Sequence, residues 1–84
     1  MAGTTYYAGL PIGSTIEKPA GIFRRTHTEP YPTDEVFARD RAWHPTASIS
    51  MHFMNQLDYD LQEITEAAAM AVIDGWTSKW DREA

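Results

Sequence analysis

Four arginines stand out among the residues whose types and spacing could do chemistry. They come as two close pairs, Arg24 with Arg25 and Arg39 with Arg41, on either side of a proline-rich loop. An arginine fork binds carboxylates and phosphates through two parallel hydrogen bonds, so the group could form a basic binding patch. The alternative is an ion-pair network at the edge of a sheet, in which acids of neighbouring strands neutralise each arginine. The candidate acids for such a network are Glu35, Asp58 and Asp60.

The remaining polar residues do not form a recognisable catalytic or metal-binding motif. The three histidines, His27, His44 and His52, lack the short or helical spacing that a metal site requires. No serine stands in a G-x-S-x-G elbow, and no glycine-rich segment leads directly into a helix as a phosphate loop does. We therefore expect no cofactor, no metal and no catalytic residue, and we predict that the protein is not an enzyme.

The charge distribution argues against nucleic-acid binding. The sequence of 84 residues has a net charge of −5, and all of this excess lies in residues 42–84, where seven acids face only Lys79 and Arg82. An acidic surface repels phosphate, which makes nucleic acid an unfavourable partner. The chain has no cysteine and no long apolar run, so we expect a cytoplasmic protein without a membrane segment.

The hydrophobic pattern predicts an α+β fold. Short β-prone or alternating runs predict strands over 4–8, 14–18, 22–26, 35–39 and 58–64, while helical spacing predicts helices over 46–55 and 66–80. We expect one domain over 1–84, with a small antiparallel sheet of three to five strands and two helices packed on one face. Residues 1–13 are expected to carry a loosely attached strand, and residues 81–84 a frayed tail.

The last predicted helix carries an apolar stripe that should face the core. Its members recur at helical spacing and are Ala69, Val72, Ile73, Trp76 and Trp80. Trp80 lies near the end of this stripe, so it either extends the core or stands exposed as an anchor for a partner. Gly75 interrupts the helix, and we expect another element to pack closely against it.

Several short motifs resemble those of small uncharacterised proteins of actinobacteria and their phages. These are "FRR" at 23–25, "EVF" at 35–37, "WHP" at 43–45, the acidic run at 59–64 and the stretch 65–76 that ends in Trp. The resemblance covers residues 19–80. It implies an actinobacterial or actinophage source and an accessory role, and it brings no catalytic residue with it.

Together these observations favour a non-enzymatic protein-interaction domain, such as a phage-encoded accessory factor that modulates a host protein. One alternative is a self-assembling structural or regulatory subunit, hence a homo-oligomer, and another is a small enzyme. We expect a protein partner and neither nucleic acid nor membrane. The predicted partner-binding residues are Arg24, Arg25, Arg39, Arg41 and Trp80.

Overall fold

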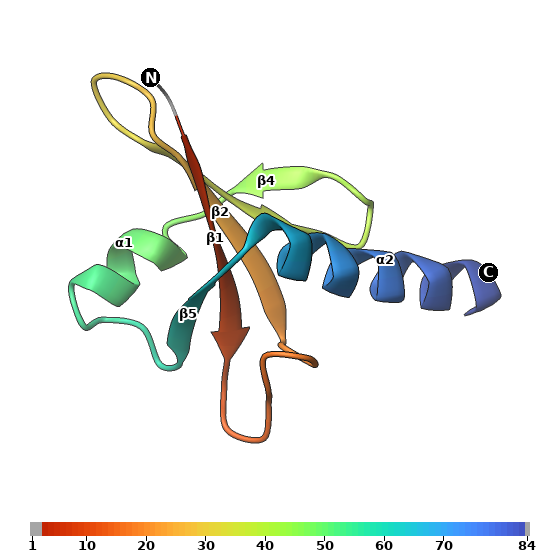
Figure 1. The fold of residues 1–84 in the computed structure, drawn as a ribbon. Coiled ribbons are helices and arrows are strands. Elements are labelled where there is room, and N and C mark those ends of the chain that lie inside the picture. Colours follow the sequence, from red (N-terminus) through yellow and green to blue (C-terminus); the bar gives the residue numbers. More distant parts are fainter. Residues whose placement is uncertain (1–2, 84) are drawn as a thin grey trace.

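The computed structural model describes residues 3–83 and is built on an open, five-stranded antiparallel sheet with two helices (Figure 1). The strand order across the sheet is β4-β3-β2-β1-β5. The strands are β1 (Thr4–Leu10), β2 (Gly21–Thr26), β3 (Thr33–Phe37), β4 (Trp43–Pro45) and β5 (Asp60–Ile64); the helices are α1 (Ser48–Phe53) and α2 (Glu66–Glu83). The predicted α+β class and antiparallel sheet are confirmed.

Strand β1 lies in the interior of the sheet, where we expected a loosely attached strand. It pairs with β2 on one side and with β5 on the other. Residues 6–9 are buried, and three consecutive side chains there are apolar, which is typical of a strand covered on both faces. The expectation of a loose strand was therefore wrong, while residues 1 and 2 lie outside the described residues.

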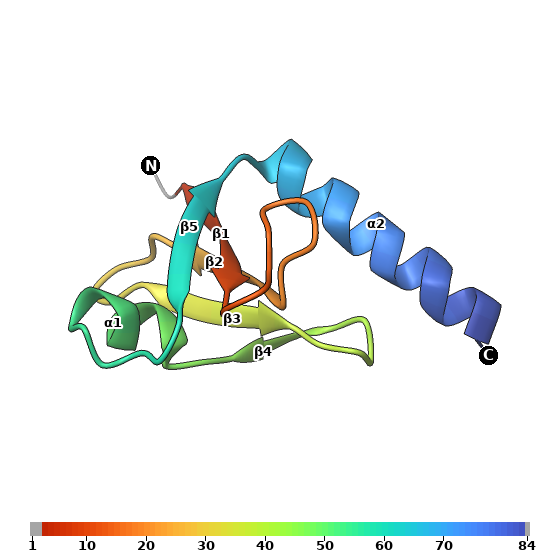
Figure 2. The same ribbon diagram turned by 90° about the horizontal axis from the view of Figure 1, so that it is seen from below.

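The two helices cover opposite faces of the sheet, and the prediction that they share one face was wrong (Figure 2). Helix α2 packs Ala69 and Ile73 on one cluster of strand residues: Tyr6, Ala8 and Ile22. Helix α1 packs Ile49 on a second cluster: Tyr7, Phe23 and Leu61. Neighbouring residues of a strand point to opposite faces, so the apolar pairs Tyr6–Tyr7 and Ile22–Phe23 require cover on both sides.

One predicted strand is a loop, and one strand was missed. Residues 14–18 turn back on themselves, since the Lys18 backbone N–H donates to both the carbonyl and the hydroxyl of Thr15. Residues 43–45 form the edge strand β4 instead of leading directly into a helix. The turn before β4 is closed by Asp40, whose carboxylate accepts from the Ala42 N–H, and by Arg41 in the left-handed region at φ 67°.

Helix α2 presents the predicted inner face. Ala69 and Ile73 are buried, and Val72 and Trp76 pack against their cluster. The Thr65 hydroxyl accepts from the Ala68 N–H and caps the first turn. No other element comes within 4 Å of the position that a Cβ would occupy at Gly75, so the expected close packing there was wrong.

The end of α2 is ordered as helix where a frayed tail was expected. Residues 81–83 continue the helix, and residue 84 lies outside the described residues. Asp81 and Glu83 are held by ion pairs with Arg41 and Arg39. The tail prediction was therefore wrong for 81–83, because these tertiary contacts were not visible in the local sequence.

We predict that Ile73→Asp unfolds the protein. The change would bury an unpaired carboxylate under the sheet, which costs several kcal/mol against a total stability of about 5–10 kcal/mol. Circular dichroism and thermal melting check this outcome. Ala67→Asp, an exposed change in the first turn of the same helix, is the matched control and should melt near the wild type.

We also predict that stability falls as the pH rises above 10. Burial raises the pKa of Tyr6 above its usual 10.0, helped by the hydrogen bond that its hydroxyl donates to Glu66, and burial likewise raises the pKa of Tyr7. The fold thus favours the neutral phenol, so this contribution is complete below the unfolded pKa and is lost as the pH rises through the folded pKa.

Urea unfolding followed on both sides of pH 10 measures the loss. Replacing both buried tyrosines (Tyr6→Phe with Tyr7→Phe) should flatten the alkaline decline, whereas Tyr31→Phe in an exposed loop should leave it unchanged. An equally steep decline in the double variant would contradict the assignment.

Candidate functional site

Arg24 and Arg25 are structural ion-pair partners on opposite faces of β2. The register of the β2–β3 pair places Glu35 opposite Arg24 and Asp34 opposite Arg25. Arg24 Nε donates to Glu35 at 2.9 Å, and its guanidinium lies 4.1 Å from the centre of the Trp43 ring. Both residues therefore belong to an ion-pair network of the sheet. Arg24 has the expected partner Glu35, whereas Arg25 pairs with Asp34 and not with the expected Asp58 or Asp60.

Arg25 makes the most enclosed of the ion pairs. Its Nε and one terminal nitrogen donate to the two oxygens of Asp34 at 2.8 and 2.9 Å, and the same terminal nitrogen donates to Ser50 at 3.2 Å. The side chains are only 17% and 10% exposed. The hydrogen bonds to Asp34 raise the pKa of Arg25 above its ordinary value. This pair ties β2 to β3 and reaches α1, so it is committed to the fold.

Arg39 and Arg41 lie near the turn between β3 and β4 and hold the far end of α2. Arg39 donates to Glu83 at 2.8 Å, and Arg41 pairs with Asp81. Arg39 keeps 71% of its side chain exposed. The structure thus divides the four arginines among three places, and of the predicted binding residues only Arg39 and Trp80 line the same hollow.

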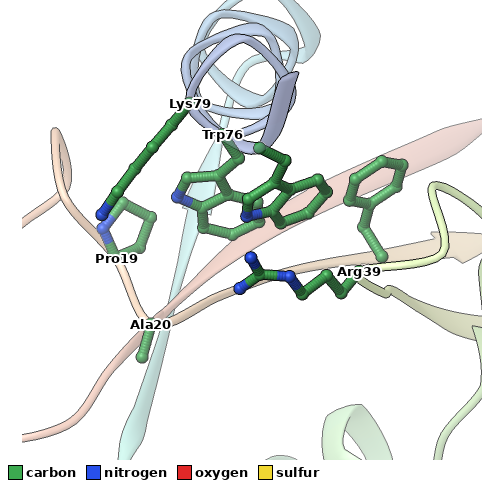
Figure 3. Close-up of a pocket in the computed structure, with 7 residues that line it drawn as sticks. Pro19, Ala20, Arg39, Trp76 and Lys79 are labelled. Atoms are coloured by element: carbon green, nitrogen blue, oxygen red, sulfur yellow. The ribbon is translucent and has the colours of Figure 1, made fainter. Parts of the chain in front are cut away.

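Arg39 and Trp80 line an open hollow under the end of α2 (Figure 3). We call this hollow the Trp groove. Lys79 and Trp76 extend from α2 toward Pro19 and Arg39, and the hollow measures about 360 Å³. Its lining consists of Pro19, Ala20, Phe37, Arg39, Trp76, Lys79 and Trp80.

Three aromatic rings form a stacked row in the Trp groove. Trp80 lies nearly parallel to Phe37, with ring centres 6.2 Å apart and planes 4° apart, and it stacks on Trp76 at 6.3 Å. The Arg39 guanidinium lies 5.5 Å from the centre of the Trp80 ring. Both indoles are only half-buried, so the row joins the edge of the core to solvent.

The Trp groove continues along α2. A neighbouring hollow of about 430 Å³ shares Pro19, Trp76 and Lys79 with it and adds Lys18 and Gly75 among its lining residues. Because Gly75 has no side chain, the helix surface stays low at this point. The groove thus forms a channel between α2 and the loop that joins β1 to β2, and its charged lining residues are Lys18, Arg39 and Lys79 together with Glu17.

This arrangement of aromatic rings and cations around an open hollow is suited to binding. Within residues 3–83 no group of three or more His, Asp or Glu side chains could hold a metal ion. A close His–carboxylate contact, at 2.7 Å, joins His44 of β4 to Asp40 in the turn before it and lies outside the groove. The hydrogen bond from His44 lowers the pKa of Asp40 and supports the turn.

The sequence singled out Arg39 and Trp80 as binding residues and Trp76 as a core residue, and it gave no site signal for the other groove residues. Phe37 was assigned only to a strand, and Pro19, Ala20 and Lys79 carried no signal of a site. They come from three segments that meet only in the folded chain. The acidic surroundings of Lys79 were the one available hint, since Lys79 and Arg82 are the sole cations of residues 42–84.

Comparisons with known proteins give no relative from which the site could be interpreted. No protein-family model matches the chain, and no curated protein or solved structure matches it. Among residues 3–83, neither helix combines the length and apolar character needed to cross a membrane.

We predict that Arg25→Ala destabilises the protein by on the order of 2 kcal/mol. The change leaves Asp34 largely enclosed without its partner, although the site is open enough to fall below the cost for fully buried pairs. Arg39→Ala removes an exposed pair and should cost less than about 1 kcal/mol. Urea unfolding of the two variants compares them, and equal losses would show that the two ion pairs do not differ in role.

Proposed function

We propose that this protein is a non-enzymatic interaction domain that binds an acidic segment of a protein in the Trp groove. One observation carries the proposal. An open hollow is lined by two tryptophans and a phenylalanine, with Arg39 and Lys79 beside them. Tryptophan and arginine are the residue types that most often dominate the binding energy of protein interfaces.

The charged residues around the Trp groove favour an acidic binding segment. The protein carries a net charge of −5, yet Lys18, Arg39 and Lys79 line this channel and outnumber Glu17, the one acid among its described lining residues. Among the described residues Lys79 and Lys18 have no ion-pair partner, and Arg39 shares its charge with Glu83 alone. An incoming carboxylate would be attracted here and repelled over most of the remaining surface.

The row of aromatic rings determines which uncharged side chains the bound segment should carry. Flat ring faces accept other rings, prolines and aliphatic side chains, and their burial provides most of the affinity. An extended segment with an acidic residue next to proline or an aromatic residue suits such a groove. Nucleic acid is disfavoured because a duplex extends beyond the channel and would also meet Asp74 and Asp81 on the same helix, whereas a short acidic segment needs only the cations of the channel.

The proposal includes the cellular setting expected from the sequence. The protein would act in the cytoplasm of a bacterium or of a phage-infected cell, in keeping with a chain that has no cysteine. A host protein bound by a phage-encoded accessory factor is the partner that fits the resemblance.

Selection from a random-peptide display library on the immobilised protein tests the proposal. We expect enriched peptides to carry an acidic residue beside proline or an aromatic residue. Lys79→Glu should weaken their binding at least about tenfold, or roughly 1.4 kcal/mol. Arg82→Glu makes the same charge change on the same helix outside the groove lining and should have little effect.

Two outcomes would overturn the proposal. One is selection of peptides without acidic residues, whose binding is unchanged in Lys79→Glu. The other is a salt-dependent shift of duplex DNA by micromolar protein, which would make Arg39 and Lys79 phosphate contacts.

A further inference from the structure

The loop between β2 and β3 presents a segment of the chemistry that the Trp groove selects. Residues 27–32 read His-Thr-Glu-Pro-Tyr-Pro, so an acidic residue and a tyrosine stand among prolines. Tyr31 is 78% exposed, and Glu29 is exposed beside it. Tyrosine joins an apolar ring to a polar hydroxyl and is enriched at interfaces, so Tyr31 is suited to enter an aromatic groove.

The loop is held in shape by its own hydrogen bonds. The Thr28 hydroxyl donates to the Tyr31 carbonyl at 2.7 Å and lies 3.0 Å from the Thr33 hydroxyl. Two prolines restrict the backbone on either side of Tyr31. A loop fixed in this way loses little conformational entropy on binding, which favours its use as an anchor.

The loop cannot reach the groove of its own chain. It precedes β3 at Thr33, whereas Phe37 and Arg39 of the groove follow from the other end of that strand (Figure 1). A strand of five residues separates the two by about 13–17 Å, and the loop extends away from the sheet at that end. The only copy of this loop that could enter the groove belongs to another molecule.

We propose that the Trp groove binds the β2–β3 loop of a second copy of this chain, in a reciprocal two-fold dimer. This inference rests on the proposed function, because it names the occupant of the same groove. Tyr31 of one protomer would stack on the row of Trp76, Trp80 and Phe37 of its partner. Glu29 would face Lys79 and Arg39, which provides the charge complementarity.

The positions of loop and groove at opposite ends of β3 are compatible with a two-fold arrangement, which closes the assembly as a dimer. When two molecules lie antiparallel, each loop meets the groove of the other, and both contacts form through one symmetry operation. A groove of about 360 Å³ lies within the range of about 300–1,000 Å³ that binds compact ligands, so one aromatic side chain with its flanking prolines is a reasonable occupant.

Sedimentation equilibrium of the full chain over a range of concentrations tests the dimer. The wild type should show a reversible monomer–dimer equilibrium. Tyr31→Ala, Glu29→Lys and Lys79→Glu should each raise the dimer Kd at least about tenfold. Phe53→Ala, which removes another exposed aromatic residue, and Arg82→Glu are the controls and should leave the Kd unchanged.

Mixing two defective variants gives a sharper result. Tyr31→Ala retains an intact groove and Lys79→Glu retains an intact loop, so a mixture should form a heterodimer with one good contact. Its Kd should lie between those of the wild type and the single variants. Restored dimerisation in the double variant Glu29→Lys with Lys79→Glu would support the direct charge pair.

The possible failures separate this inference from the proposed function. A wild type that stays monomeric, forms larger assemblies, or dimerises without sensitivity to Tyr31→Ala overturns the reciprocal dimer. If library peptides still bind in a Lys79-dependent manner, the proposed function stands without it. If neither peptides nor a second copy occupy the groove, both proposals fall.

Discussion

The fold depends on a central strand that is apolar on both of its faces. Tyr6 and Ala8 of β1 point to one side and Tyr7 to the other, and β2 repeats the pattern with Ile22 and Phe23. A sheet of this kind is stable only when both faces are covered. Since the described chain contains only two helices, each must cover one face alone, and neither can cover it completely. The exposed Phe53 and Met54 at the end of the short α1 are one consequence.

The length of helix α2 explains how the Trp groove arises at the other end of the molecule. Eighteen residues of α2 extend about 27 Å, and its C-terminal half reaches past the sheet (Figures 1 and 2). Only the end of β3 meets this part of the helix, where Phe37 stacks on Trp80 and Trp80 stacks on Trp76. Arg39 and Arg41 pair with the last turn. The Trp groove is the space left between this extended helix and the loop before β2.

The elements with strong local signals could be predicted from the sequence. Ala69, Val72, Ile73 and Trp76 recur at helical spacing, and the structure places all of them on the inner face of α2. The order of the strands in the sheet could not be predicted from local signals. The local run 4–8 indicates a strand but not its central place, because strand order is set by pairing with β2 and β5.

The candidate site shows the same division between local and long-range information. Arg24 and Arg25 looked like members of one basic patch because they are adjacent in sequence, yet adjacent residues of a strand face opposite ways. Their true partners depend on a register that places Asp34 and Glu35 directly across the strand pair. Trp80 and Arg39 were identified by residue type, whereas the groove they share required the approach of Pro19 and Phe37.

Strand β3 connects these observations, since it carries a surface feature at each end. Its first residue follows the rigid loop with Tyr31, and its last residue, Phe37, stacks on Trp80. Along its length, Asp34 and Glu35 bind the arginines of β2, so the strand is held firmly by partly buried ion pairs. Loop and groove are therefore kept at a fixed separation and orientation. A partner that engages both must match that spacing, and a second copy related by the proposed two-fold axis would do so by symmetry.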